Sequence, residues 1–154
     1  MTTITYTSII PTPVTDVFAF YNDLNNLPRI SPKWPKVTIL NVEGDIRQGT
    51  RIELQIGLFW INIRWLVLIK EHNANRSFLD IQEKGPFARW SHRHEFQPAP
   101  EGTLLTDRIE AELPWHPISA PILLFIVIPN LKKMLRHRHE RTRQLLQKAK
   151  KAAL

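Results

Sequence analysis

The segment from Phe78 to Phe96 reads FLDIQEKGPFARWSHRHEF and contains two strand-like runs on either side of a Gly85-Pro86 turn. A strand presents alternate residues to opposite faces of a sheet. In the second run one face carries only charged side chains, which we expect in water: Arg89, Arg93 and Glu95. The opposite face then points to a covered interior: Trp90, His92, His94 and Phe96. The segment therefore predicts an antiparallel hairpin in a half-buried sheet.

Further strand-like runs flank this hairpin on both sides. They are predicted at Thr2 to Ile10, Lys36 to Val42, Thr50 to Ile56, Trp60 to Glu71, Ser77 to Glu83, Ala88 to Gln97 and Thr103 to Leu113. Turn residues separate the later runs, among them Glu43-Gly44-Asp45 and the segment Pro98 to Gly102. Consecutive strands joined by short turns form an antiparallel meander, and such a sheet must have one face covered.

Three helical segments complete the pattern. A short helix starts at Thr15 or Asp16 and ends near Asn22, and a second short stretch runs from Leu24 to Ile30. After Pro114 and Pro117, a long helix is predicted from about Ile118 to Ala152. Its second half carries an apolar stripe at helical spacing, formed by Leu131, Leu135, Thr142, Leu145, Leu146 and Ala149.

These elements predict an α+β helix-grip fold. In this fold a curved antiparallel sheet of six or seven strands wraps around a long C-terminal helix, with two short helices after the first strand. A curved sheet gripping a helix leaves a cavity suited to an apolar ligand. We expect residues 1–154 to form a single domain, since no repeat or linker interrupts the pattern.

The composition excludes several classes of function. The chain has 154 residues, 43% of them hydrophobic and 23% charged, which is typical of a globular protein. The absence of cysteine excludes disulfides, thiol nucleophiles and Cys-bound metals. With 5 glycines, no Gly-rich phosphate loop is found. The N-terminus does not resemble a signal peptide, and the apolar run from Pro121 to Ile128 is too short to cross a bilayer. We therefore expect a cytoplasmic protein.

The stretch from Phe78 to Phe96, followed by Gly102-Thr103 and Asp107, resembles the SRPBCC (START/Bet v 1-like) superfamily. Within it, the stretch is similar to a bacterial branch of polyketide cyclase/dehydrase-like ligand-binding proteins. Residues Val14 to Asp23 also look like the first helix of that family. The resemblance implies a helix-grip fold with a hydrophobic cavity. The superfamily includes lipid carriers, quinone binders and cyclases, so fold alone does not select among them.

Polar residues interrupt the otherwise apolar inner face of the predicted sheet. A hairpin centred on Gly85-Pro86 sets Asp80 opposite His92 and Gln82 opposite Trp90, and the next hairpin brings Asp107 near His94. These groups either satisfy one another and tie the strands together, or orient the polar group of a ligand. A third interpretation is acid–base catalysis by His92, His94 and Asp107, because histidine titrates near neutral pH.

The candidate ligand-binding residues share the predicted inner face or a loop beside it. They are Asp80, Gln82, Trp90, His92, His94, Phe96, Asp107, Trp34 and Trp65. His92-x-His94 with Asp107 contains suitable ligand types for a metal. This spacing is common by chance on a strand, so we expect no metal and no cofactor.

Basic residues concentrate in the end of the predicted C-terminal helix, about residues 131–154. From Lys132 to Lys151 there are nine Lys and Arg residues against one acid, Glu140. The basic face of this helix is either solvated or attracted to anionic lipid. Nucleic-acid binding is not expected, because no sequence signature of a nucleic-acid-binding domain accompanies the basic residues. His137 and His139 are expected on this exposed face.

The predicted strand from Trp60 to Glu71 has two partly apolar faces. This pattern indicates a homodimer contact or a membrane-facing surface.

The function predicted from the sequence is binding of a small hydrophobic molecule, such as a lipid, a quinone or a polyketide-like compound, in a cavity under the C-terminal helix. The first alternative is a cyclase or dehydratase that uses a His–Asp pair as acid and base. The second is a lipid or quinone chaperone that contacts anionic membranes.

Overall fold

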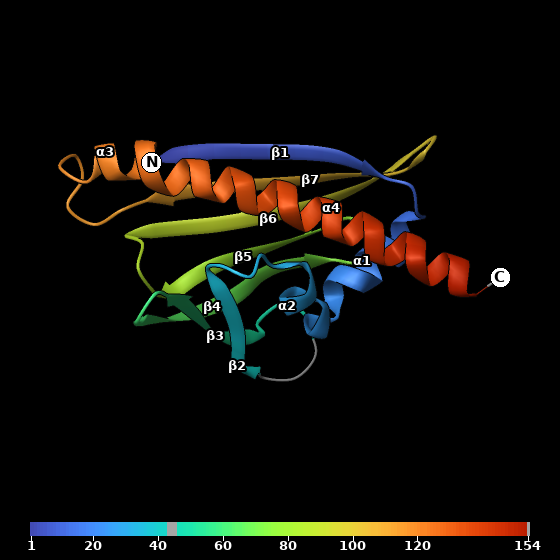
Figure 1. Ribbon diagram of the computed structural model, residues 1–154, viewed down its shortest axis with the longest axis horizontal. Coiled ribbons are helices and arrows are strands. Elements are labelled where there is room, and N and C mark those ends of the chain that lie inside the picture. The colour runs from blue at the N-terminus through green and yellow to red at the C-terminus, as the bar shows by residue number, and fades with distance from the viewer. Residues whose placement is uncertain (43–45, 154) are drawn as a thin grey trace.

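The computed structural model describes residues 1–42 and 46–153, and these residues form a seven-stranded antiparallel sheet (Figure 1). The turn predicted at Glu43-Gly44-Asp45 lies outside the described residues. The strands are β1 (Thr2–Ile10), β2 (Lys36–Val42), β3 (Arg51–Leu58), β4 (Ile61–Asn73), β5 (Ser77–Lys84), β6 (Arg89–Ala99) and β7 (Gly102–Glu112). Their order is β1-β7-β6-β5-β4-β3-β2, so β1 closes the meander at the edge beside β7.

The register of the central hairpins follows the sequence pattern. Asp80 of β5 pairs with His92 of β6, and His94 pairs with Asp107 of β7. Gly102 closes the β6–β7 hairpin with a positive φ of 135°, where a Cβ would collide with the backbone of residues 10–12. This tight turn fixes the register that brings Asp107 beside the two histidines.

The helices lie on one face of the sheet. They are α1 (Val14–Asn22), η1 (Leu24–Asn26), α2 (Leu27–Ile30), α3 (Ala120–Ile122), η2 (Leu123–Val127) and α4 (Ile128–Ala152). The last three are continuous, with π-helical hydrogen bonding over η2, and α4 runs diagonally along the inner face of the sheet (Figure 1). The helix-grip class predicted from the sequence is confirmed.

The core packs α1 and part of α4 against the sheet. One cluster joins Ile4, Trp90 and Ile109 to Leu135 of α4, and another joins Phe18 of α1 to Phe96. Burial of these side chains, at roughly 1.5–3 kcal/mol each, holds the helices on the sheet.

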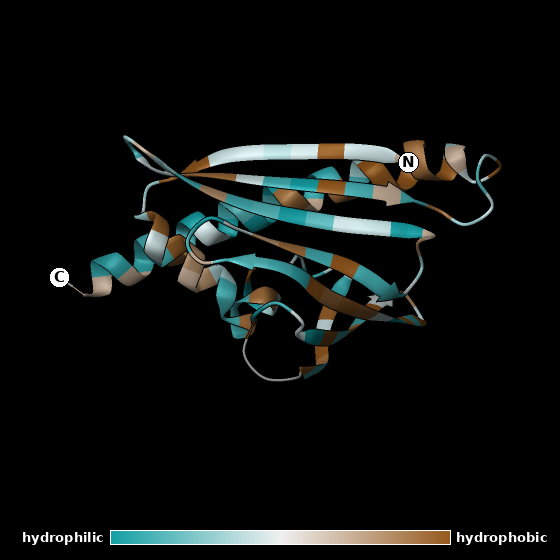
Figure 2. Ribbon diagram, turned by 180° about the vertical axis from the view of Figure 1, so that it is seen from behind, coloured by the Kyte–Doolittle hydropathy of each residue, from teal (hydrophilic) through white to brown (hydrophobic). Residues whose placement is uncertain are grey.

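Large apolar side chains remain exposed at one end of the molecule. They belong to the β3–β4 turn and to the segment from Trp115 to Ile126, which is mostly brown beside the N label in Figure 2. The exposed members include Phe59, Trp60, Trp115, Ile118 and Phe125. Within the described residues, no helix combines the length and the apolar character needed to cross a membrane.

Candidate functional site

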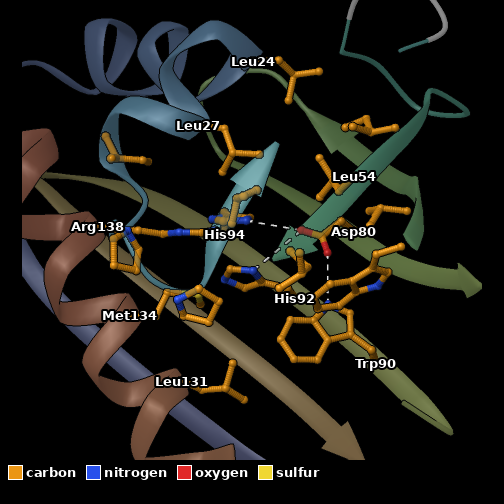
Figure 3. A pocket seen from close by; sticks show the side chains of 18 of the residues that line it. Leu24, Leu27, Leu54, Asp80, Trp90, His92, His94, Leu131, Met134 and Arg138 are labelled. Carbon is orange, nitrogen blue, oxygen red and sulfur yellow. Dashed lines mark hydrogen bonds and ion pairs between the residues drawn. The ribbon is translucent and has the colours of Figure 1, made fainter. Parts of the chain in front are cut away.

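A cavity of about 420 Å³ lies between the inner face of the sheet and the helices. Strands β2 to β6 supply one wall, and α1, α2, η2 and α4 supply the other. Most of the lining is apolar, including Leu24, Leu27, Leu54, Leu131 and Met134 (Figure 3). Trp34 and Ile126 line the cavity and are 48% and 57% exposed, so the cavity reaches the surface beside them.

Six of the candidate residues from the sequence line this cavity: Trp34, Trp65, Asp80, Trp90, His92 and His94. The other three do not. The side chain of Gln82 donates to and accepts from the main chain of Phe87, closing the β5–β6 turn. Phe96 packs into the core against Phe18 and Tyr21. Asp107 lies behind the two histidines and is 1% exposed.

Asp107 connects three histidines. Its Oδ2 accepts a hydrogen bond of 2.7 Å from Nε2 of His139, whose Nδ1 is 2.7 Å from Ser8 Oγ. Its Oδ1 lies 2.6 Å from Nδ1 of His94 and 3.2 Å from Nε2 of His92. These two contacts have the length of ion pairs, but none of the three atoms has a well-aligned hydrogen bond among the described residues. They are therefore electrostatic contacts between charged or polar groups.

Asp80 contacts His92 and His94 from the side of the cavity. Its Oδ2 is 3.4 Å from Nε2 of His94 and 3.8 Å from Nδ1 of His92. Its Oδ1 accepts a hydrogen bond of 3.4 Å from Nε1 of Trp90. Figure 3 shows these side chains meeting at one wall of the cavity. Each of the two histidines thus lies between two carboxylates, one buried and one beside the cavity.

The two histidines differ in protonation state. Burial lowers the pKa of His92, and the charge of His94 lowers it further. Burial also acts to lower the pKa of His94, but Asp107 and Asp80 outweigh it and raise that pKa to about 9. Burial acts to raise the pKa of Asp107, but His94, His92 and His139 hold it well below its usual range. At neutral pH the site therefore contains a charged His94 beside a neutral His92.

The sequence analysis missed two residues of α4 that face this site. His139, expected on the exposed face, is 1% exposed and hydrogen-bonded to Asp107. Arg138 lines the cavity, and its Nη2 donates to Ser31 Oγ at 3.2 Å. Both positions lie on the same side of the helix as Leu135 and Thr142 by helical spacing. The helical periodicity of the sequence could therefore have predicted that Arg138 and His139 face the sheet. His137 is exposed, as expected.

Asp80, His92 and His94 could hold a metal ion, because one ligand atom from each lies within 4.8 Å of the others. For a metal site, the sequence analysis considered Asp107 together with His92 and His94. In the structure the carboxylate that could complete such a site is Asp80. Asp107 contacts the ring nitrogens that point away from the cavity. The same arrangement can transfer protons, because a neutral imidazole accepts a proton and an imidazolium donates one.

The fold and the site together define a helix-grip protein with an apolar cavity and one polar wall. Residues 10–137 match the family described as polyketide cyclase / dehydrase and lipid transport, and the chain belongs to this family. The family and its START-like fold suggest a role in binding hydrophobic ligands. No curated protein matches the sequence.

Solved structures of the same fold come from several bacteria. The protein TTHA0849 from Thermus thermophilus is 23% identical, with a TM-score of 0.70 over 92% of this chain and 97% of that one. A START superfamily protein from Mycobacterium smegmatis is 16% identical, with a TM-score of 0.71 over 93% of this chain and 98% of that one. An AHSA1-like protein from Aeromonas hydrophila is 12% identical, with a TM-score of 0.64 over 94% of each chain. At these identities the likeness establishes the fold.

Proposed function

We propose that this protein binds a small hydrophobic molecule in the cavity between the sheet and α4. The observation that carries the proposal is the cavity itself, about 420 Å³ in volume and lined mainly by apolar side chains. Pockets of roughly 300–1,000 Å³ with a few placed polar groups are typical of small-molecule sites. Moving an apolar ligand from water into such a cavity provides the binding energy, at roughly 25 cal/mol per Å² of apolar surface buried.

The polar wall gives the ligand an orientation. Asp80, His92 and His94 line the cavity, while Asp107 fixes both histidines from behind. The Nε1 of Trp65 is buried in the same wall without a hydrogen-bond partner among the described residues. A ligand that places its polar group at this wall satisfies such atoms, whereas a reversed ligand leaves them unpaired.

Binding is tested with phenylnaphthylamine, a neutral apolar dye whose fluorescence rises in apolar surroundings. Leu54 lines the same sheet wall of the cavity as Asp80 (Figure 3), so Leu54→Trp fills part of the volume. Leu68 is partly buried on the same sheet but does not line the cavity, and Leu68→Trp is the matched control. We expect saturable binding by the wild type and Leu68→Trp, and at least tenfold weaker binding by Leu54→Trp. Equal binding by all three proteins would place the dye elsewhere and overturn the proposal.

A second candidate, a carrier that docks on membranes, is favoured by the exposed apolar residues beside the open end of the cavity. Trp60, Trp115 and Phe125 are each at least 79% exposed there, and Lys132 and Lys133 follow on the first turns of α4. Aromatic side chains with adjacent cations suit an anionic bilayer surface.

Sedimentation with lipid vesicles tests this second candidate. We expect the protein to sediment with vesicles that contain phosphatidylserine more than with neutral ones. Phe125→Ser should reduce sedimentation, and added salt should do the same. Absence of wild-type binding to either vesicle would exclude membrane docking and leave the cavity proposal intact.

A further inference from the structure

The cavity contains one permanent positive charge. Among the described residues that line it, Arg138 is the only lysine or arginine. Figure 3 shows its side chain extending from α4 toward His94, with Asp80 on the other side of that ring. Because the guanidinium group does not lose its proton in proteins, this charge is present at any physiological pH.

Arg138 has few partners for its five N–H donors. Its Nη2 donates to Ser31 Oγ at 3.2 Å, while its Nε is buried with no hydrogen-bond partner among the described residues. No ion pair within 4.0 Å joins its guanidinium to a described acidic group. Arginines that stabilise a structure usually pair with a carboxylate or with several carbonyl oxygens.

The nearby carboxylates are already engaged elsewhere. Asp107 contacts His92, His94 and His139, and Asp80 contacts His92, His94 and Trp90. The remaining acidic group of the lining, Asp23, is exposed and bound to Asn25. Burial lowers the pKa of Arg138, and the charges of Asp107 and Asp80 offset only part of this effect through space. They leave its donors without a direct acceptor within ion-pair distance among the described acidic groups.

A planar oxyanion is the ligand group that completes such a site. A carboxylate accepts parallel hydrogen bonds from a guanidinium group, and charge-assisted bonds of this kind are about twice as strong as neutral ones. The apolar lining around Leu131 and Met134, which precede Arg138 on α4, would hold the body of the same molecule.

We propose that the cavity selects anionic amphiphiles, molecules with an apolar body and a carboxylate or similar oxyanion that binds Arg138. This inference rests on the proposed function and adds the chemical class of the ligand. It also assigns Arg138 as the residue that determines specificity between a charged and a neutral head group.

The test compares two ligands with the same apolar chain, dodecanoate and dodecanol, by displacement of phenylnaphthylamine. We expect the wild type to bind dodecanoate roughly tenfold to a hundredfold more tightly than dodecanol, as for a hydrogen bond to a charged group. Arg138→Gln should remove this preference, and Arg138→Lys should retain part of it. Arg136→Gln is the matched control, because Arg136 is exposed on the other face of α4 and does not line the cavity.

The outcomes separate the inference from the proposed function. If the wild type binds both ligands equally, or if Arg138→Gln keeps the full preference, the inference is overturned while the binding function stands. If the wild type binds neither the dye nor either ligand, the binding function itself fails. If Arg138→Gln does not fold, the wild-type preference and the Arg138→Lys variant still decide the inference.

Discussion

Four consecutive residues of α4, Arg136-His137-Arg138-His139, present the same two residue types in two environments. Arg136 and His137 are exposed, whereas Arg138 and His139 face the sheet. The inner pair falls on the side of the helix that also carries Leu135 and Thr142, both fully buried. The position on the helix, and not the residue type, thus decides whether a basic side chain is solvated or becomes part of a site.

The inner pair differs from the outer pair in what it contacts. His139 joins Ser8 of β1 to Asp107 of β7, so it links the edge of the sheet to the site. Arg138 lines the cavity and bonds Ser31 at the end of α2. The basic segment of α4 therefore contains both a solvated surface and part of a polar core.

The largest expected effect on stability comes from removing the carboxylate of Asp107, which contacts His92, His94 and His139. Asp107→Asn leaves a charged His94 without its buried partner, and we expect a loss of about 3–5 kcal/mol in the free energy of unfolding. Glu110→Gln on the other face of β7 removes an exposed ion pair with Arg108 and should cost less than about 1 kcal/mol. Urea denaturation measures both variants. Similar losses for the two would show that the histidine network is not a stabilising core.

The pH dependence of stability tests the charge state of the buried His94. The pKa of His94 is raised from 6.5 to about 9, so the folded state binds its proton more tightly than the unfolded state. This contribution to stability is fully present below pH 6.5 and is lost as the pH rises through about 9. We expect the urea midpoint of the wild type to fall over this range. The lowered pKa of His92 acts only as the pH falls below its unfolded value, so it does not oppose this trend.

NMR titration of the histidine rings measures the pKa of His94 directly and needs no variant. His94 should titrate near pH 9. A titration of His94 at or below pH 6.5 would contradict the two carboxylate contacts.

The next largest expected effect is a difference in stability between variants of His139 and His137, the two histidines of α4. His139→Ala removes the hydrogen bond to Asp107 and the contact with Ser8, at about 1.5–3 kcal/mol for a bond to a charged group. His137→Ala changes an exposed side chain and should stay within about 0.5 kcal/mol. Thermal or urea unfolding compares them. If the two losses were equal, the distinction between the faces of α4 would have no energetic meaning.

The smallest expected effect concerns ligand binding by the two faces of β6. His94→Ala opens the polar wall of the cavity and should weaken dodecanoate binding several-fold. Arg93→Ala removes an outer ion pair with Glu71 and should leave binding unchanged. Dye displacement measures both variants, and equal weakening would mean that the ligand does not contact the inner face of β6.

Much of the fold follows from local pattern. Alternation in β6 identified its buried face, and the turn residues predicted Asp80 opposite His92 and Asp107 near His94, as the register of the sheet confirms. The contacts of α4 could not be assigned in the same way. Asp107 and His139 are 32 residues apart on elements joined by a long connection, so their meeting depends on how the helix packs on the sheet. The basic composition of α4 also hid the two inward positions, although the apolar stripe included their spacing.

Predictions for single side chains at the cavity had a similar limit. Alternation placed Gln82 and Phe96 on the inner face, and the structure uses them to close a turn and to fill the core. Period-two alternation distinguishes two faces of a sheet, but it does not show where along a strand the cavity ends and the packed core begins.

The most direct test of a binding site under α4 is an NMR titration with labelled methionine methyl groups. The chain has 2 methionines, Met1 and Met134. Met134 lines the cavity beside Arg138, whereas Met1 is 61% exposed at the end of the chain. On saturation with dodecanoate, we expect the Met134 signal to shift and the Met1 signal to stay unchanged. Saturation without a shift at Met134 would contradict binding in this cavity.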